Sequence, residues 1–156
     1  MTQKDKELLL KDLCARLPYG VKVQHQHQNY LEEVQTVEHI SRKYGEIETN
    51  SVSGFADDFK PYLKPLYSMT EEEKEDLLIT LLGKNGTKYF QVLPDGSIDN
   101  NDAAHQDLSN FNIHWINFDG VNTSTYIDWL NAHHFDYRGL IEKGLAIDCT
   151  GLNIYT

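Results

Sequence analysis

The sequence predicts an α+β protein made of two small units, and three observations lead to this prediction. Capping-box patterns at Thr2 and Thr70 precede segments in which leucines recur at helical spacing. Short apolar segments separated by Gly-containing turns follow each predicted helix, which is typical of antiparallel strands. The charge balance changes between residues 69 and 70, so we expect one unit over residues 1–69 and another over residues 70–156.

The first unit is expected to be a helix followed by a small barrel-like antiparallel sheet. Thr2 and Asp5 have the spacing of a helix cap, the apolar stripe includes Leu10, Leu13, Cys14 and Leu17, and Pro18 should end the helix. Alternation predicts strands near residues 21–24, 34–40 and 46–50. Pro61 and Pro65 should interrupt any regular strand ladder around them.

The second unit is expected to be an acidic α+β unit. Its first helix should begin after the Thr70 cap, bury a leucine stripe and end at Gly83. Further strands are expected at residues 88–93, 111–118 and 145–147, with a polar loop over 99–110. A helix should begin near Thr123, and a short helix over residues 138–143 should be closed by Gly144.

The charge distribution bears on the classes of partner. The 156-residue chain has 14 Lys plus Arg and 24 Asp plus Glu, a formal net charge of −10. Residues 1–69 hold 9 basic and 10 acidic side chains, whereas residues 70–156 hold 5 and 14. A nucleic-acid binder needs cations facing phosphates, and a membrane-surface module needs a basic face, so we expect neither partner. A nucleic-acid interface would require basic residues of the first unit to gather on one face, namely Lys22, Arg42, Lys43, Lys60 and Lys64.

The start of the chain has no apolar signal segment, and no apolar run is long enough to span a membrane. Two cysteines, Cys14 and Cys149, form no disulfide framework and no zinc motif, which suggests a reducing compartment. We therefore expect a cytoplasmic protein without a cofactor.

Two histidine pairs are the candidates for metal binding or catalysis. His25 and His27 would point from one face of a strand, but no third ligand stands at a motif spacing, so a solvated strand end is the preferred interpretation. His133 and Asp136 could form a base and its orienting carboxylate, but no motif places a nucleophile beside them. An acidic loop that includes Asp95, Asp99, Asn101, Asp102 and Asp107 fails the calcium-hand pattern. We expect no metal site and no catalytic residue.

Four segments resemble a family of small uncharacterised proteins encoded by prophages and other mobile elements of anaerobic gut bacteria. They are residues 8–21, 59–66, 68–73 and 127–146, about a third of the chain. The resemblance implies a bacterial cytoplasm, and it implies no activity and no catalytic residue.

The leading hypothesis is a non-enzymatic accessory protein of a phage or mobile element that binds another protein. Aromatic and arginine side chains dominate interface hot spots, so the expected contact region is Trp129, His133, His134, Tyr137 and Arg138. Arg138 has an alternative role, neutralising nearby carboxylates. Two other functions stay open: a metal-assisted hydrolase that uses the histidines, and an acidic decoy whose residues 71–76 imitate nucleic-acid phosphates.

Overall fold

The computed structural model describes residues 1–30, 33–41, 43–100 and 123–155. The chain is α+β, with helices, a mixed six-stranded sheet and a small two-stranded sheet. Its residues form two compact units: unit 1 comprises Met1–Pro65 and Asn131–Thr156, and unit 2 comprises Leu66–Leu130. The expected division placed all residues after 69 together, whereas residues 131–155 pack with the N-terminal part.

Unit 1 begins with helix α1, Gln3–Arg16, and its cap is the one that the sequence predicts. The Thr2 hydroxyl accepts a hydrogen bond from Asp5 N at 3.2 Å, and the Asp5 carboxylate accepts one from Thr2 N at 3.1 Å. The helix ends two residues before Pro18, which lies in a 3₁₀ turn, η1, Leu17–Tyr19. Gly20 then reverses the chain with φ of +67°, a conformation that glycine adopts at little cost.

The large sheet has the strand order β4-β3-β2-β1-β5-β8. All neighbouring pairs are antiparallel except β5 and β8, which are parallel. The strands are β1 Lys22–His25, β2 Val34–Ser41, β3 Glu46–Thr49, β4 Ser53–Phe55, β5 Phe59–Leu63 and β8 Ile147–Asp148. No pairing within the described residues joins β4 to β8, so the expected barrel-like closure is not confirmed.

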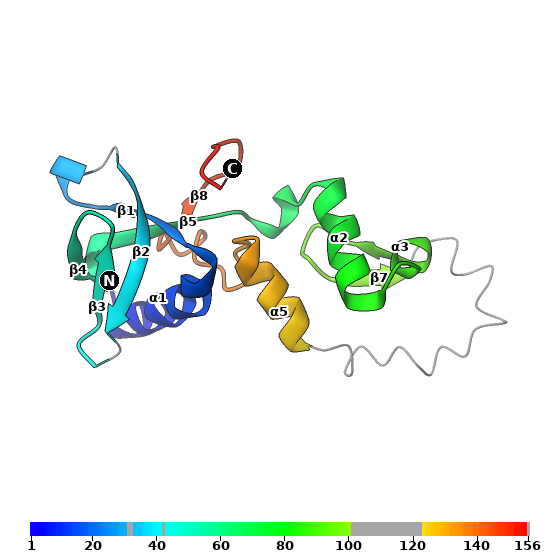
Figure 1. Cartoon of the computed structure of the whole chain (residues 1–156), viewed down its shortest axis with the longest axis horizontal. Coiled ribbons are helices and arrows are strands. Elements are labelled where there is room, and N and C mark those ends of the chain that lie inside the picture. Colours follow the sequence, from blue (N-terminus) through cyan, green and yellow to red (C-terminus); the bar gives the residue numbers. More distant parts are fainter. Residues whose placement is uncertain (31–32, 42, 101–122, 156) are drawn as a thin grey trace. The chain divides into compact units, whose positions relative to one another are not determined.

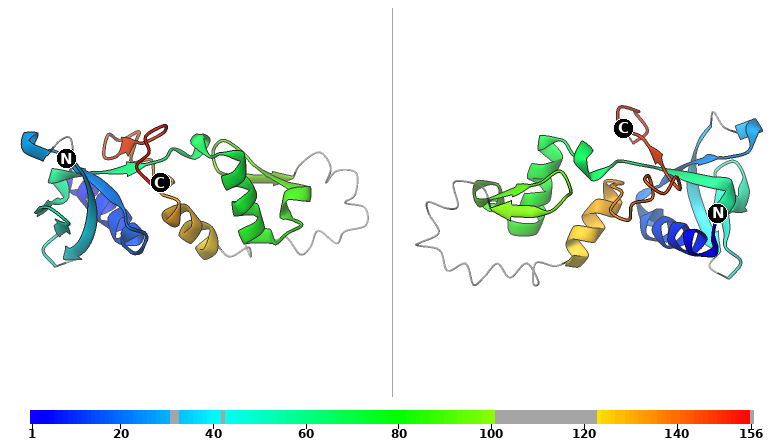
Figure 2. Two further views of the ribbon diagram at one scale, coloured as in Figure 1. Left: turned by 45° about the horizontal axis from the view of Figure 1, so that its top comes forward. Right: turned by 180° about the vertical axis from the view of Figure 1, so that it is seen from behind.

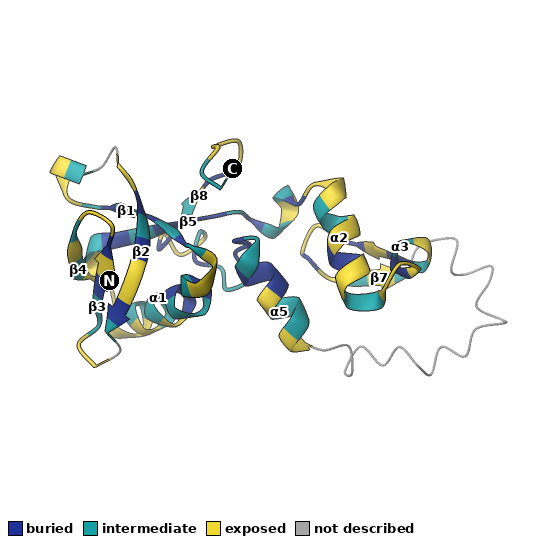
Figure 3. Ribbon diagram, viewed as in Figure 1, coloured by how far each residue is buried: buried dark blue, intermediate teal, exposed yellow. Residues whose placement is uncertain are grey.

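The core of unit 1 lies between α1 and one face of this sheet (Figures 1 and 2). Leu9 and Leu13 of α1 are fully buried, and residues of β2 alternate between buried and exposed over part of its length (Figure 3). The C-terminal segment closes the core with Leu140, Leu145 and Ala146. Helix and sheet therefore bury a common apolar layer to which the end of the chain contributes.

Strand β5 runs through Pro61, which corrects the expectation that this proline interrupts the ladder. In an antiparallel pair, hydrogen-bonded and non-hydrogen-bonded residue pairs alternate. Gln26 N donates to Asp58 O at 2.7 Å, so by this alternation Pro61, which faces Val23, falls in a non-hydrogen-bonded pair. The missing N–H of Pro61 therefore removes no hydrogen bond between β5 and β1. The pairing of β5 with β8 begins only at Tyr62.

A tyrosine hydroxyl takes the place of a direct ladder bond just beyond Pro61. Lys22 N donates to the Tyr155 hydroxyl at 3.0 Å, and that hydroxyl donates to Tyr62 O at 2.8 Å. Burial raises the pKa of Tyr155 above its ordinary value, which keeps its proton available for the second bond. The end of the chain is thereby fastened between β1 and β5.

Unit 2 contains the second predicted cap. The Thr70 hydroxyl accepts from Glu73 N at 3.2 Å at the start of α2, Glu71–Leu82, and Gly83 ends the helix with φ of +77°. The remaining described elements are the 3₁₀ turn η4 Leu66–Ser68, α3 Gly86–Tyr89, β6 Phe90–Val92, β7 Ile98–Asn100 and α5 Thr123–Ala132, whose last two residues belong to unit 1. The shorter 3₁₀ turns of unit 1 are η2 Gln28–Tyr30 and η3 Ala56–Asp58.

Two expected elements differ from the structure. Residues 88 and 89 are helical, because Gly86 starts α3 where a Cβ atom would lie 2.7 Å from Leu78 O. Residues 138–143 form turns in place of the expected short helix, because the Asp136 carboxylate binds Leu140 N and Ile141 N at 2.9 and 2.8 Å. The expected strand at 111–118 and most of the polar loop lie outside the described residues.

Replacing Tyr155 with Phe tests the tyrosine bridge. We expect Y155F to leave Lys22 N and Tyr62 O unpaired and to lower the free energy of unfolding of unit 1 by about 1–3 kcal/mol. Hydrogen exchange at the Lys22 amide is the direct measurement, since it reports this one bond. Y19F is the matched control, because Tyr19 is an exposed tyrosine outside the bridge. Equal exchange at Lys22 in all three proteins would contradict the bridge.

Candidate functional site

An ion cluster fastens α1 to the C-terminal segment within unit 1; it consists of Asp12, Arg16 and Arg138. Asp12 Oδ2 accepts from Arg16 Nε at 2.8 Å, and Asp12 Oδ1 accepts from Arg16 Nη2 and Arg138 Nε, each at 3.1 Å. The side chains of Asp12 and Arg16 are fully buried, and that of Arg138 is 16% exposed. Arg16 Nη2 also donates to Phe135 O at 2.8 Å. The cluster is held by charge-assisted hydrogen bonds, which are stronger than neutral ones.

Tyr137 connects the two guanidinium groups of this cluster. Its ring centroid lies 5.6 Å from Arg16 Cζ and 4.6 Å from Arg138 Cζ, within the range of cation–π attraction. Its hydroxyl accepts from Arg138 Nη2 at 2.6 Å and donates to Asn131 Oδ1 at 3.1 Å. These contacts fix the direction in which the Arg138 side chain points.

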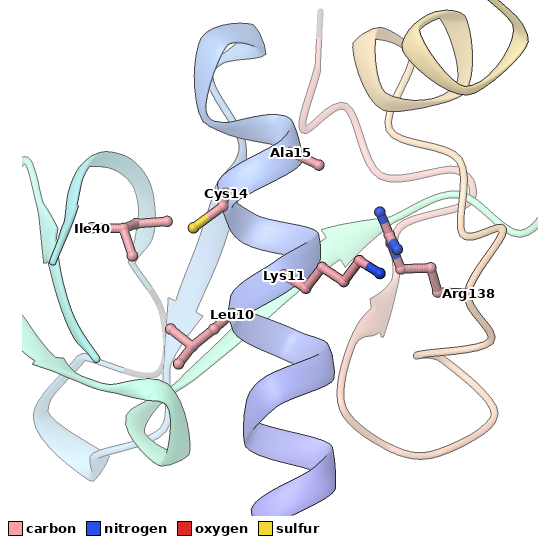
Figure 4. A pocket seen from close by; sticks show the side chains of 6 residues that line it. All are labelled: Leu10, Lys11, Cys14, Ala15, Ile40 and Arg138. Atoms are coloured by element: carbon pink, nitrogen blue, oxygen red, sulfur yellow. The ribbon is translucent and has the colours of Figure 1, made fainter. Parts of the chain in front are cut away.

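A groove of about 410 Å³ crosses the surface of α1 beside this cluster; we call it the α1 groove. Its floor consists of four residues from two successive turns of α1: Leu10, Lys11, Cys14 and Ala15. Ile40 of β2 stands at one side and Arg138 at the other. Figure 4 shows Leu10 and Cys14 on the side of α1 toward Ile40, and Lys11 and Arg138 on the opposite side. The groove thus has an apolar end and a cationic end.

The β2–β3 turn lies next to the apolar end of the groove. A Cβ atom on Gly45 would lie 3.6 Å from Leu10 Cδ1, so this turn approaches α1 closely. The same turn carries Tyr44, which is 66% exposed, and the Lys43 ammonium lies 5.0 Å from the Tyr44 ring centroid. The turn that approaches Leu10 therefore carries an exposed aromatic side chain and a further cation.

The five residues predicted as a contact region do not form one exposed patch. In unit 2, Trp129 is buried and its Nε1 donates to Asp76 Oδ2 at 2.7 Å. In unit 1, His134 is buried, Tyr137 is engaged with the ion cluster, and His133 is partly exposed. Arg138 is the one member of the predicted set that lines the α1 groove. Arg138 also pairs with the Asp12 carboxylate of α1, which is the alternative role predicted for it, and this pair joins distant parts of the chain.

His134 is held neutral inside unit 1. Its ring stacks on Tyr155 with centroids 3.6 Å apart and an interplanar angle of 11°, and its Nδ1 is buried without a hydrogen-bond partner within the described residues. Burial, together with the positive charges of Arg16 and Lys64, lowers the pKa of His134 to about 3. Its φ of +60° is rare for a residue with a side chain. The ring therefore serves packing, and no proton transfer near neutral pH follows from this environment.

The remaining candidates for metal binding also make internal contacts. His25 Nδ1 accepts from His27 N at 3.0 Å, and the His25 ring packs against Phe59 and Tyr30. Asp95 accepts from Ser97, while Asn101, Asp102 and Asp107 lie outside the described residues. Within the part of the chain that the structure describes, no three His, Cys, Asp or Glu residues converge as a metal site would require.

No family model, curated protein or solved structure matches this chain. Among the described residues, no helix combines the length and apolar character that crossing a membrane requires.

Sequence reasoning missed Asp12 and Arg16, although a signal for them exists. Together with Leu9 and Leu13 they fall at helical spacing on one face of α1, and all four are fully buried. An acidic and a basic residue four positions apart on an apolar helix face indicate a paired charge inside the core. The third member, Arg138, stands 126 residues away from Asp12, and no local pattern connects the two.

Replacing Asp12 with Asn tests the ion cluster. We expect D12N to leave Arg16 buried without its counter-charge and to lower the free energy of unfolding of unit 1 by about 3–5 kcal/mol. D57N is the matched control, because Asp57 pairs with Lys6 at the surface and such pairs contribute about 0–1 kcal/mol. Denaturant unfolding monitored in both variants decides the matter. A D12N protein as stable as D57N would show that the cluster contributes little.

The buried His134 predicts a pH dependence of stability. Its folded pKa of about 3 lies below the ordinary value of 6.5, so the unfolded chain takes up a proton that the folded chain does not. The free energy of unfolding should therefore fall as pH decreases from 6.5 toward 3, by up to about 1.4 kcal/mol per pH unit. In H134N, which retains a residue tolerant of positive φ, this part of the slope should disappear.

The measurement is denaturant unfolding between about pH 8 and pH 4.5, where the His titration falls. H39N is the control, because His39 is exposed. Parallel profiles for the wild type and H134N would contradict the neutral, buried state of this ring.

Proposed function

We propose that this chain is a non-enzymatic accessory protein that binds another protein, and that the partner docks in the α1 groove. The groove is the observation that carries the proposal. Its volume of about 410 Å³ falls within the range of ligand pockets, about 300–1,000 Å³, and its floor combines apolar side chains with one free thiol. We also propose that the protein works in the bacterial cytoplasm for a prophage or mobile element, which rests on the resemblance of four sequence segments.

The surroundings of the groove favour protein recognition. Interface hot spots are enriched in tyrosine and arginine set around a desolvated centre. Arg138 stands at one side of the groove, and Tyr44 is exposed on the turn next to Leu10. The ion cluster fixes Arg138 beforehand, so little side-chain entropy remains to be lost when a partner binds it.

The alternatives have less support than the groove. A metal-assisted hydrolase needs converging ligands, and His25 and His27 contact each other and neighbouring rings. An acidic decoy needs free carboxylates in a row along α2, but Lys74 pairs with Glu71 at 2.6 Å and Asp76 accepts from Trp129. Protein binding in unit 1 requires no additional group.

The experiment fills the groove with one side chain. A15W places an indole on the groove floor without changing charge, and Q3W places the same side chain at the exposed first turn of α1. Each tagged protein is incubated with lysates of anaerobic gut bacteria, after circular dichroism has shown that both variants are folded. We expect the wild type and Q3W to retain the same protein and A15W to lose it.

Cys14 provides a second measurement on the same complex. Cys14 lines the groove whereas Cys149 is buried, so iodoacetamide should modify Cys14 first. The retained protein should slow this modification at least about tenfold, as expected when a fully packed interface excludes the reagent. A partner that A15W retains equally, unchanged alkylation of Cys14, or no retained protein would each overturn the proposal.

A further inference from the structure

We infer that the α1 groove recognises a segment of a partner protein in which an apolar side chain stands next to a carboxylate. This inference rests on the proposed function and adds the chemistry of the partner. The apolar side chain would lie against Leu10, Cys14 and Ile40, and the carboxylate would lie between Lys11 and Arg138.

The first argument is the charge of the ion cluster. Asp12 supplies one negative charge, whereas Arg16 and Arg138 supply two positive charges. Counted over these three side chains, the cluster carries one excess positive charge. Arg138 is the member with an exposed fraction and it lines the groove, so its guanidinium is accessible there to an anion.

The second argument is the position of Lys11. It lies on the groove floor, is exposed, and makes no ion pair within the described residues. Figure 4 shows its side chain reaching toward the Arg138 guanidinium on the same side of α1. Two like charges that approach each other raise the local electrostatic energy, and an anion placed between them lowers it. A carboxylate accepts hydrogen bonds from both donors, and these charge-assisted bonds are strong.

The third argument is the order of the groove residues. Leu10 and Cys14 lie toward Ile40, and these side chains pack on or belong to the apolar core of unit 1. The apolar end is thus continuous with the core. A polar group bound there would lose its hydrogen bonds to water without gaining others, which costs free energy. A ligand that fits must be apolar at one end and anionic at the other. A leucine or phenylalanine beside an aspartate or glutamate meets both demands.

The negative charge of the whole chain does not oppose this inference. Residues 66–130 hold 3 Lys, no Arg and 11 Asp plus Glu, so most of the net −10 belongs to unit 2. At physiological ionic strength charges are screened over about 8 Å, and contacts at the groove dominate over distant charges. The same argument predicts binding that weakens as salt rises.

The test uses labelled peptides of about twelve residues and the full-length protein. One peptide contains a single phenylalanine flanked by glutamates, with both ends blocked. A second replaces each glutamate with glutamine. A third carries the glutamines but has a free C-terminal carboxylate next to the phenylalanine, which separates an acidic side chain from a chain terminus as the anion source. Fluorescence anisotropy measures Kd at about 50 and 500 mM NaCl, on either side of effective screening.

We expect the glutamate peptide to bind at least about tenfold more tightly than the glutamine peptide, as paired charges at an interface permit. K11Q should weaken the glutamate peptide about three- to tenfold, and K4Q, at an exposed position of the same helix outside the groove, should leave its Kd unchanged. A15W should abolish binding. Preferential binding of the free-terminus peptide would keep the carboxylate and assign it to a chain end.

Equal affinity for the glutamate and glutamine peptides, or no binding by any peptide up to millimolar concentration, would overturn this inference. Neither result affects the proposed function if A15W still loses the captured protein. A partner that binds A15W as well as the wild type removes the proposed function itself. The two failures are therefore distinguished by the same variant.

Discussion

The bonds from Asp12 to Arg16 and Arg138 are the constraint on which the architecture of unit 1 depends. A buried ion pair is costly to desolvate, and it is tolerated only when every member is satisfied. Arg16 reaches Phe135 O across 119 residues of sequence, and Arg138 reaches Asp12 across 126. These two bonds join the C-terminal segment to α1, and they contribute to the discontinuous composition of unit 1.

Several kinds of contact hold the C-terminal segment, residues 131–155, in unit 1. Lys64 N donates to His134 O at 2.9 Å and Asp136 N to Lys64 O at 2.8 Å, forming a parallel bridge beside β5. Strand β8 pairs with β5 in parallel along the other edge of the strand, and the Tyr155 hydroxyl closes the ladder beyond Pro61. Hydrogen bonds of the backbone, a side-chain bridge and the ion cluster thus act on one segment. Their combined geometry accounts for the neutral, tightly stacked ring of His134.

Local signals in the sequence predicted local structure well. The caps at Thr2 and Thr70 start helices as expected, because the capping interactions span three residues. The prediction that Pro61 interrupts the ladder was wrong. A strand tolerates a proline in a non-hydrogen-bonded residue pair, and the sequence does not show which kind of pair Pro61 forms with Val23. The α1 groove was not predictable, because Arg138 reaches it from a distant part of the sequence and the segment 131–155 gives no local sign of packing on α1. Of the predicted contact region, the arginine alone belongs to the groove.

Arg138 therefore has two roles: it binds Asp12 inside unit 1, and it lines the α1 groove where we propose that the partner binds. Arg16 alone already gives Asp12 a bidentate partner and a neutral pair, so charge balance does not demand a second guanidinium. Adding Arg138 makes the cluster positive and puts that charge beside Leu10 and Lys11, at the edge of an apolar surface. A partner that supplies both an anion and an apolar side chain would pair with that charge and cover the apolar side chains, which is the physical reason to place recognition at this groove.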